Sequence, residues 1–317
     1  MKLLAALALV LAATGAQAAT GAQAATVPAP LAALQALDTR VQSVGWRLVS
    51  RNALFCATVV PGIGLLLQDV TGYDDPQAVR SSLGLRRDIA VQAVAADGPA
   101  ARAGLAANDP LDKVAGQDVV TLPPARPGDY ARLAGLHDRI DAALDSTGRV
   151  ELARAGQVLT VIGEPACVSR FELLSSGIRA AADGRRVVIG RKLVEALPED
   201  DLLAAALAHE LAHNVLGHRA RLDATGRAWS KVKRTEREAD RLSVWLLANA
   251  GYEPEASLRF FARWGPMTDL GPLSSPDHDR WKTRVKRLTA EIATMGSAMA
   301  KDAGGAANWA RDFVAEE

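Results

Sequence analysis

The sequence predicts an α+β protein in which a small β-rich domain is inserted near the N-terminus of a mainly helical domain. Three observations predict this fold class. Helical apolar spacing precedes residue 56, glycine turns and short strands fill residues 61–166, and long helical patterns follow. We therefore expect residues 25–60 to form the first helix of the larger domain, residues 61–166 the inserted domain, and residues 167–317 the rest of the larger domain.

The composition is that of a folded, globular protein. The chain has 317 residues, of which 49% are hydrophobic and 23% charged, and its formal net charge is +1. These values exclude a disordered chain and a collagen-like fibre. A net charge this close to zero gives no reason to expect binding to nucleic acid.

Residues 1–24 have the features of a secretory signal peptide. Lys2 is followed by eleven apolar residues, and the tripeptide Ala-Gln-Ala then occurs twice, ending at Ala18 and at Ala24. Cleavage after either copy is equally compatible with this pattern. The apolar run is too short to span a bilayer, which needs about 20 residues. We expect the mature protein to be soluble and either periplasmic or secreted.

The two cysteines, Cys56 and Cys167, flank the predicted inserted domain. Export would place them in an oxidising compartment, where a disulfide between them is favoured. Two separate buried thiols are the alternative. A disulfide here would close a loop of about 100 residues and would clamp both ends of the inserted domain.

The inserted segment carries the pattern of a small β domain. Residues 89–94 alternate as a strand, residues 97–105 give a turn and a short helix, and residues 108–119 give strand, tight turn and strand. A hairpin is expected over residues 150–161. This succession resembles a PDZ domain of the bacterial HtrA type.

The PDZ resemblance implies a peptide-binding site at the loop made of Gly62, Ile63, Gly64 and Leu65. Such domains bind peptides by adding a strand to an exposed sheet edge, and backbone N–H groups of this loop would hold a terminal carboxylate. The alternative is a structural or regulatory β domain that has no open groove.

The C-terminal half is expected to be mostly helical. A long apolar helix is predicted over residues 202–216, and a second helix runs from about Lys231 to Ala250, where Gly251 ends it. Further amphipathic helices are expected over residues 255–264 and 280–295.

The strongest functional signal is an HExxH motif, His209-Glu210-Leu211-Ala212-His213, inside the first of these helices. Residues i and i+4 share a helix face, so His209 and His213 can bind one Zn²⁺. Glu210 is poorly aimed at the metal and can instead hold the attacking water and take its proton. In an apolar helix these polar side chains would be costly without a metal or other partners.

A third ligand is available on the next helix. Glu236 and Asp240 are four residues apart and share a face. Glu236 can complete the zinc site, while Asp240 can accept a hydrogen bond from a ligand histidine and orient it. Glu238 should face elsewhere. The pattern predicts one Zn²⁺ per chain, held by His209, His213 and Glu236, with a fourth position open for water.

His218 is expected to lie at a helix end or on the surface and not to bind the metal. Around the helix its side chain lies about 140° from that of His213. The residues at 216 and 219 also differ from the pattern in which a third histidine at this spacing binds zinc. His137 has no partner nearby in the sequence and is expected to be structural or exposed.

The HExxH motif followed by an ExxAD motif at 236–240 resembles the gluzincin metallopeptidases of the CAAX prenyl protease and HtpX family. The segment 246–256 also looks like this family. Members commonly carry a His-Pro pair and then an arginine on a helix. His278 and Arg284 fall at the matching spacing, with Asp279 in place of the proline.

The resemblance implies that His278 lies near the active site. It is a candidate for transition-state stabilisation, or for a fourth zinc ligand that blocks the site at rest, and a surface loop histidine is the alternative. Either His278 or Arg284 could help to stabilise the oxyanion. The strand over residues 186–189 could pair with the substrate backbone, as in related gluzincins.

Together these motifs predict an exported zinc endopeptidase that acts on proteins or peptides with Glu210 as general base. A role in envelope protein quality control would fit. The alternative is a peptide-binding chaperone or scaffold that uses the PDZ-like domain beside a blocked zinc site. Eight basic residues against four acids between Arg219 and Arg241 suggest a peripheral membrane contact, for which a solvated helix face is the simpler interpretation. The oligomeric state leaves no readable trace.

Overall fold

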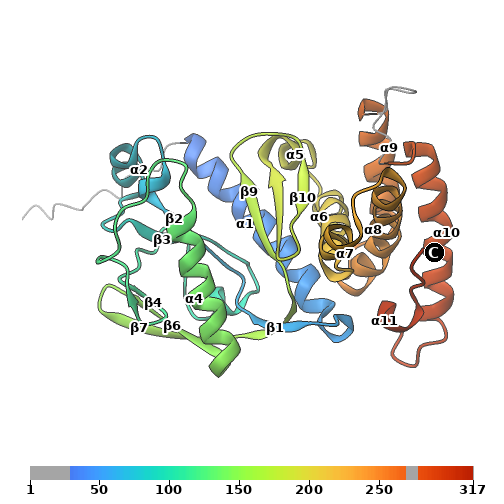
Figure 1. Ribbon diagram of the computed structural model, residues 1–317. Coiled ribbons are helices and arrows are strands. Elements are labelled where there is room, and N and C mark those ends of the chain that lie inside the picture. Colours follow the sequence, from blue (N-terminus) through green and yellow to red (C-terminus); the bar gives the residue numbers. More distant parts are fainter. Residues whose placement is uncertain (1–28, 269–277, 317) are drawn as a thin grey trace, which may run out of the picture.

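The computed structural model describes residues 29–268 and 278–316 and has the predicted α+β fold. The β-rich part lies on the left of Figure 1 and the helical C-terminal part on the right. The predicted signal peptide, residues 1–24, lies outside the described residues. Across the described ranges, no helix combines the length and the apolar character that crossing a bilayer requires.

Helix α1 (Ala29–Arg51) runs between the two parts (Figure 1). Its apolar residues recur at intervals of three and four, and Val41, Val44 and Leu48 are buried. The helix packs on β3 (Ile89–Val94) of the β-rich part and on β9 (Arg170–Leu174) of the helical part. The predicted first helix is thus confirmed, and it is the element that both parts share.

Both ends of the β-rich part are tied together. Strand β1 (Val59–Gly62) pairs antiparallel with β8 (Glu164–Cys167). Beside this ladder, Cys56 and Cys167 form a disulfide across a sequence separation of 111. The predicted disulfide is confirmed, and the alternative of two separate thiols is wrong.

The β-rich part has an apolar core of its own, which includes Leu67, Leu111 and Leu152. Strand β2 (Leu65–Asp69) pairs antiparallel with β3, and a second sheet has the strand order β5-β4-β6-β7. The short elements of this part are η1 (Ala53–Phe55), η2 (Val70–Gly72), α3 (Pro99–Arg102), β4 (Lys113–Val114), β5 (Gln117–Asp118), β6 (Arg149–Arg154) and β7 (Gln157–Ile162). The predicted strand and hairpin are confirmed, while the domain limits 61–166 stay a prediction.

Two helices of the β-rich part are additional to the predicted elements: α2 (Pro76–Leu83) and α4 (Ala131–Thr147). The side chain of Asp75 caps α2 by accepting a hydrogen bond from the backbone N–H of Ala78, and Gly84 ends it with a φ of 64°. Helix α4 closes the core with apolar side chains at helical spacing, which are Leu133, Leu136, Ile140 and Leu144.

The helical part is built on the packing of α6 (Asp200–Val215) against α8 (Trp229–Asn249). Together with α9 (Ala256–Thr268) and α10 (Trp281–Met299), these two helices confirm the four helices predicted for the C-terminal half. The remaining helices are α5 (Arg191–Ala196), α7 (His218–Thr225) and α11 (Trp309–Asp312).

A three-stranded sheet lies beside α6 and has the order β10-β11-β9. Strand β11 (Arg186–Gly190) pairs antiparallel with β10 (Ala180–Ala182) and parallel with β9. The strand predicted at 186–189 is therefore present but central. Because both of its edges are already hydrogen-bonded, the expectation that it pairs with a substrate backbone is wrong. The edge strand next to α6 is β10.

The contact between α1 and the β-rich part contains a buried acid. Asp38 is 4% exposed, and its Oδ2 accepts a hydrogen bond from Gln92 Nε2 at 2.6 Å. Burial raises the pKa of Asp38 to about 6, and repulsion from Glu172 acts in the same direction. The folded state therefore favours the protonated form of this side chain.

The substitution Asp38→Asn should stabilise the fold above about pH 6. Because the pKa of Asp38 is higher in the folded chain than in the unfolded chain, its contribution is complete below about pH 4. It is lost as pH rises through about 6, by up to about 3 kcal/mol. Asparagine does not ionise and could donate to Gln92 Oε1, a buried atom without a partner in the described structure. Urea unfolding at about pH 4.5 and pH 8 measures the effect, and a gain of equal size at both would contradict it.

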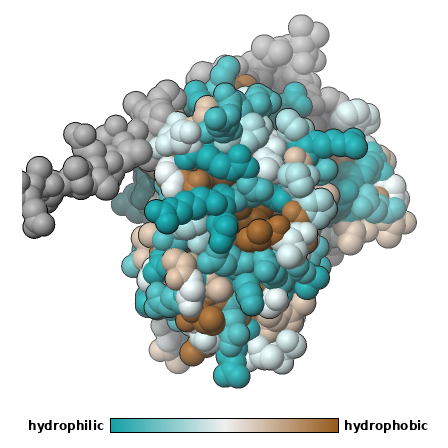
Figure 2. Space-filling model, turned by 90° about the vertical axis from the view of Figure 1, so that its left-hand side faces the viewer, coloured by the Kyte–Doolittle hydropathy of each residue, from teal (hydrophilic) through white to brown (hydrophobic). Residues whose placement is uncertain are grey.

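The outer face of the β-rich part is mostly hydrophilic, with apolar side chains gathered in small separate patches (Figure 2). The exposed apolar residues of β7 are Val158 and Ile162. Small patches of this kind are normal on protein surfaces and identify no partner by themselves.

Candidate metal centre

The packing of α6 against α8 brings three metal-ligating side chains together. Nε2 of His209 lies 3.3 Å from Nε2 of His213 and 3.3 Å from Oε2 of Glu236, and Nε2 of His213 lies 3.4 Å from Oε1 of Glu236. Within the described residues, these three form the group that could hold a metal ion. A tetrahedral Zn²⁺ with ligands at about 2.0–2.1 Å holds neighbouring ligand atoms roughly 3.3 Å apart. The observed donor spacing therefore fits zinc.

The apolar pattern of α6 explains why these side chains face the same way. Residues 202–208 and the pair Leu211 and Ala212 are buried in the core. His209, Glu210 and His213 are half-buried and form the stripe of the helix that the core leaves uncovered. The packing of the apolar neighbours therefore orients His209, Glu210 and His213 toward the uncovered side of α6.

Asp240 supports the first histidine. Its Oδ1 lies 3.0 Å from Nδ1 of His209, and its two oxygens accept hydrogen bonds from Nε and Nη2 of Arg284 on α10, at 2.7 and 2.5 Å. Burial alone would raise the pKa of Asp240, but Arg284 and His209 lower it. Arg284 therefore contacts Asp240 and acts on His209 through it, while its predicted role at an oxyanion stays a prediction.

The carboxylates of Glu236 and Asp240 favour positive charge at the ligand group. Burial alone would lower the pKa of His209, but Asp240 and Glu236 raise it to about 10. Burial would likewise raise the pKa of Glu236, but the neighbouring histidines hold it well below its usual range. A divalent cation would supply the positive charge that these acids stabilise.

Glu210 is the acidic residue of the uncovered stripe. It follows His209 on α6 and is half-buried. Burial raises the pKa of Glu210, against the opposing effect of His209 and His213. A raised pKa brings a carboxylate closer to the range in which it is an effective general base near neutral pH.

Asn214, which the sequence reasoning missed, joins α6 to the edge of the sheet. Its Oδ1 accepts a hydrogen bond from the backbone N–H of Gly184 at 2.7 Å, and its Nδ2 donates to the carbonyl of Arg186 at 3.1 Å. The turn between β10 and β11 is thereby fixed next to the histidines. A polar residue directly after the second histidine was the available signal.

His218 is buried, so the expectation of a surface position is wrong. Helix α6 ends at Val215, Gly217 has a φ of 62°, and α7 begins at His218. The angle of about 140° presumed an unbroken helix, which the left-handed glycine prevents. Nδ1 of His218 consequently lies 2.8 Å from Nδ1 of His213. Burial lowers the pKa of His218 to about 4, although Glu238 opposes this.

His278 lies beside the ligand group. Its Nε2 is 2.9 Å from Oε2 of Glu236, and its side chain is 39% exposed. The next residue, Asp279, forms ion pairs with Lys233 at 2.9 Å and with Arg237 at 2.7 Å. These pairs anchor the position at which the resemblance led us to expect proline, and the role of His278 stays a prediction.

The loop Gly62 to Leu65 lies in the β-rich part, where the carbonyls of Ile63 and Gly64 accept hydrogen bonds from the backbone N–H groups of Ala100 and Ala95. A cavity of about 110 Å³ adjoins the loop. Its walls include side chains of α1 and α4, namely Trp46, His137, Ile140 and Leu144. Peptide binding in this cavity stays a prediction.

Residues 177–232 match Peptidase family M48. The matched segment contains His209, Glu210 and His213 and ends before Glu236. No curated protein matches the chain. The family match supports a relationship to zinc metallopeptidases for this segment, and it does not extend to the β-rich part.

Proposed function

We propose that this protein is an exported zinc-dependent endopeptidase of the HExxH…ExxAD type, with one Zn²⁺ per chain. The observation that carries the proposal is the spacing of 3.3 to 3.4 Å among the donor atoms of His209, His213 and Glu236. The match to Peptidase family M48 in the same segment supports the reaction class. A protein or peptide is the proposed substrate, and envelope protein quality control the proposed role.

Each side chain then has a defined task. His209, His213 and Glu236 would hold the metal, with Asp240 orienting His209. When bound, zinc would polarise the scissile carbonyl and lower the pKa of water. Glu210 takes the proton of the attacking water on its carboxylate and returns it to the leaving amine.

The substrate backbone would pair with β10. This strand has a hydrogen-bonded partner only on the β11 side among the described strands, and it lies next to α6. An extended peptide could add to the free edge of Ala180–Ala182 by backbone hydrogen bonds. The small alanine side chains of β10 would leave room for substrate side chains of different sizes.

A second candidate function is peptide binding by the β-rich part, as a chaperone or scaffold. The cavity of about 110 Å³ beside Gly62, Ile63, Gly64 and Leu65 favours it. The position of His278 against Glu236 would suit a zinc site that is blocked at rest. In this alternative the zinc site would be present but Glu210 would have no role.

A peripheral membrane contact through the basic segment 219–241 is the less favoured part of the proposal. Several of its basic residues are paired with acids, among them Arg221 with Glu238, Arg237 with Asp279 and Arg241 with Glu291. Such pairing reduces the charge that would attract an anionic lipid surface.

Metal analysis of the purified mature protein tests the zinc site. We expect about one zinc per chain in the wild type and loss of that zinc in His213→Ala, because two remaining ligands bind weakly. Glu195→Ala, at an exposed position of α5, is the matched control and should keep the metal. A wild type that stays free of zinc after zinc is supplied would overturn the proposal.

A further inference from the structure

A buried chain of polar contacts leads from zinc ligand His213 to the C-terminal end of the described residues. Its first link is His218, which is 1% exposed and stands edge-on to His213, with ring centroids 4.8 Å apart. The two Nδ1 atoms are 2.8 Å apart. A contact this short between two ring nitrogens requires that one donates and the other accepts.

The donor can be assigned from the side that faces the metal site. Nε2 of His213 points at Glu236 and His209, so it is the nitrogen that would bind zinc. The ring proton of His213 then sits on Nδ1 and is donated to Nδ1 of His218. His218 must in turn carry its own proton on Nε2, which lies 3.0 Å from Oε2 of Glu238.

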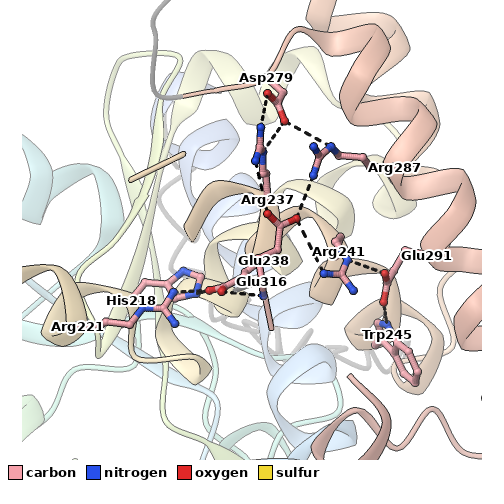
Figure 3. Close-up of polar contacts among 10 residues, drawn as sticks. All are labelled: His218, Arg221, Arg237, Glu238, Arg241, Trp245, Asp279, Arg287, Glu291 and Glu316. Atoms are coloured by element: carbon pink, nitrogen blue, oxygen red, sulfur yellow. Dashed lines mark hydrogen bonds and ion pairs between the residues drawn. The ribbon is translucent and has the colours of Figure 1, made fainter. Parts of the chain in front are cut away.

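Glu238 is a fully buried carboxylate that several donors hold in place (Figure 3). Arg221 donates to Oε2, and the backbone N–H of Glu316 donates to Oε1 at 3.1 Å. A buried carboxylate is tolerated only with such partners. The contact with Glu316 extends this chain of polar contacts to residues 313–316, which we call the C-terminal strap.

The C-terminal strap is itself anchored across α8 and α10. Phe313 packs against the main core and lies under the guanidinium of Arg241. The carboxylate of Glu316 pairs with Arg287 at 3.0 Å and with Arg237 at 3.6 Å. Both arginines also pair with Asp279, the neighbour of His278, as Figure 3 shows. The strap therefore contacts the supports of both His213 and His278.

We propose that His218 and Glu238 are positioning residues for zinc ligand His213, and that the C-terminal strap fixes Glu238. The inference rests on the proposed function, because it takes His213 as a zinc ligand. It gives His213 a support that corresponds to the one Asp240 and Arg284 give His209. The two histidine ligands would then each be held by a buried carboxylate, directly for His209 and through a second histidine for His213.

Zinc affinity, measured by competition with a chromophoric chelator, tests the proposal without depending on activity. His218→Phe keeps the ring shape but has no nitrogen, and it should weaken zinc binding about 10–100-fold. His218→Asn, which can still accept and donate, should recover part of that loss. Glu316→Ala removes the ion pairs with Arg287 and Arg237 but keeps the backbone N–H that donates to Glu238, so it should loosen the strap and weaken binding by a smaller factor. Val314→Ser, at an exposed position of the same strap, should leave binding unchanged.

Two further measurements separate positioning from general destabilisation. The absorption spectrum of the Co²⁺-substituted protein reports the ligand geometry directly and should change in His218→Phe. Leu152→Ala, in the core of the β-rich part, should destabilise the fold yet leave the zinc affinity and the Co²⁺ spectrum unchanged. If His218→Phe does not fold, Glu238→Gln takes its place, with the same expectation of weaker zinc binding.

The outcomes distinguish this inference from the function on which it rests. A wild type without zinc would overturn the proposed function. A wild type that binds zinc, together with a folded His218→Phe that has wild-type affinity and spectrum, would overturn the support chain alone. If Glu316→Ala has wild-type zinc affinity while His218→Phe binds zinc more weakly, the ion pairs of Glu316 do not help to position His213.

Discussion

Glu210→Gln should lower peptide hydrolysis by roughly 10²–10⁴ in kcat while the protein keeps its zinc. Glutamine has nearly the same shape but cannot take a proton from water. Glu210 lies beside the donor group of His209, His213 and Glu236 and does not belong to it, so the metal should be retained. Hydrolysis of an unfolded protein substrate, measured together with metal content, checks both expectations.

The matched control for this variant is Glu195→Gln, an exposed glutamate on α5 that pairs with Arg191. It should hydrolyse the substrate at the wild-type rate. If Glu210→Gln and the wild type degrade the substrate equally well, Glu210 is not the base. If neither degrades it while both bind zinc, the scaffold function of the β-rich part becomes the better explanation.

Most of the candidate site can be predicted from the sequence because helix geometry sets its residues. His209 and His213 are one turn apart on a helix, as are Glu236 and Asp240, so the spacing alone places each pair on one helix face. What joins the two pairs is the packing of α6 on α8. The many apolar residues of both helices favour such a contact, and it brings the three ligand atoms within 4.8 Å of one another.

The prediction for His218 fails because the chain turns there. The angular argument assumes an unbroken helix, but the left-handed conformation of Gly217 ends α6 and returns the next residue to the core. One dihedral angle therefore decides whether this histidine is exposed or buried against His213. The glycine is visible in the sequence, but its presence alone does not fix the direction in which the chain continues.

The sheet beside α6 is only partly predictable for a different reason. Strand β11 has a recognisable apolar pattern, but β10 is three alanines and β9 pairs with β11 in parallel. Periodicity identifies a strand without identifying its neighbours. Whether a strand is central or at an edge depends on pairing with distant segments, and this is why the sequence pattern favours β11 over β10 as the substrate rim.

Removal of the disulfide should give the largest loss of stability among these predictions. The bond between Cys56 and Cys167 closes a loop with a sequence separation of 111, for which the chain-entropy model gives about 4–5 kcal/mol. The double variant Cys56→Ala and Cys167→Ala avoids placing a hydroxyl in the core, where Cys167 is 1% exposed. Equilibrium urea unfolding should show a free energy of unfolding that is lower by about 2–5 kcal/mol.

Zinc affinity should respond differently to the same change. The three candidate zinc ligands all lie after Cys167, on α6 and α8, which pack directly against each other. The ladder between β1 and β8 joins the same two ends of the β-rich part and would still hold them together without the bond. We therefore expect the double variant to keep wild-type zinc affinity at temperatures where it is folded. A parallel fall in stability and zinc affinity would instead mean that the β-rich part helps to shape the metal centre.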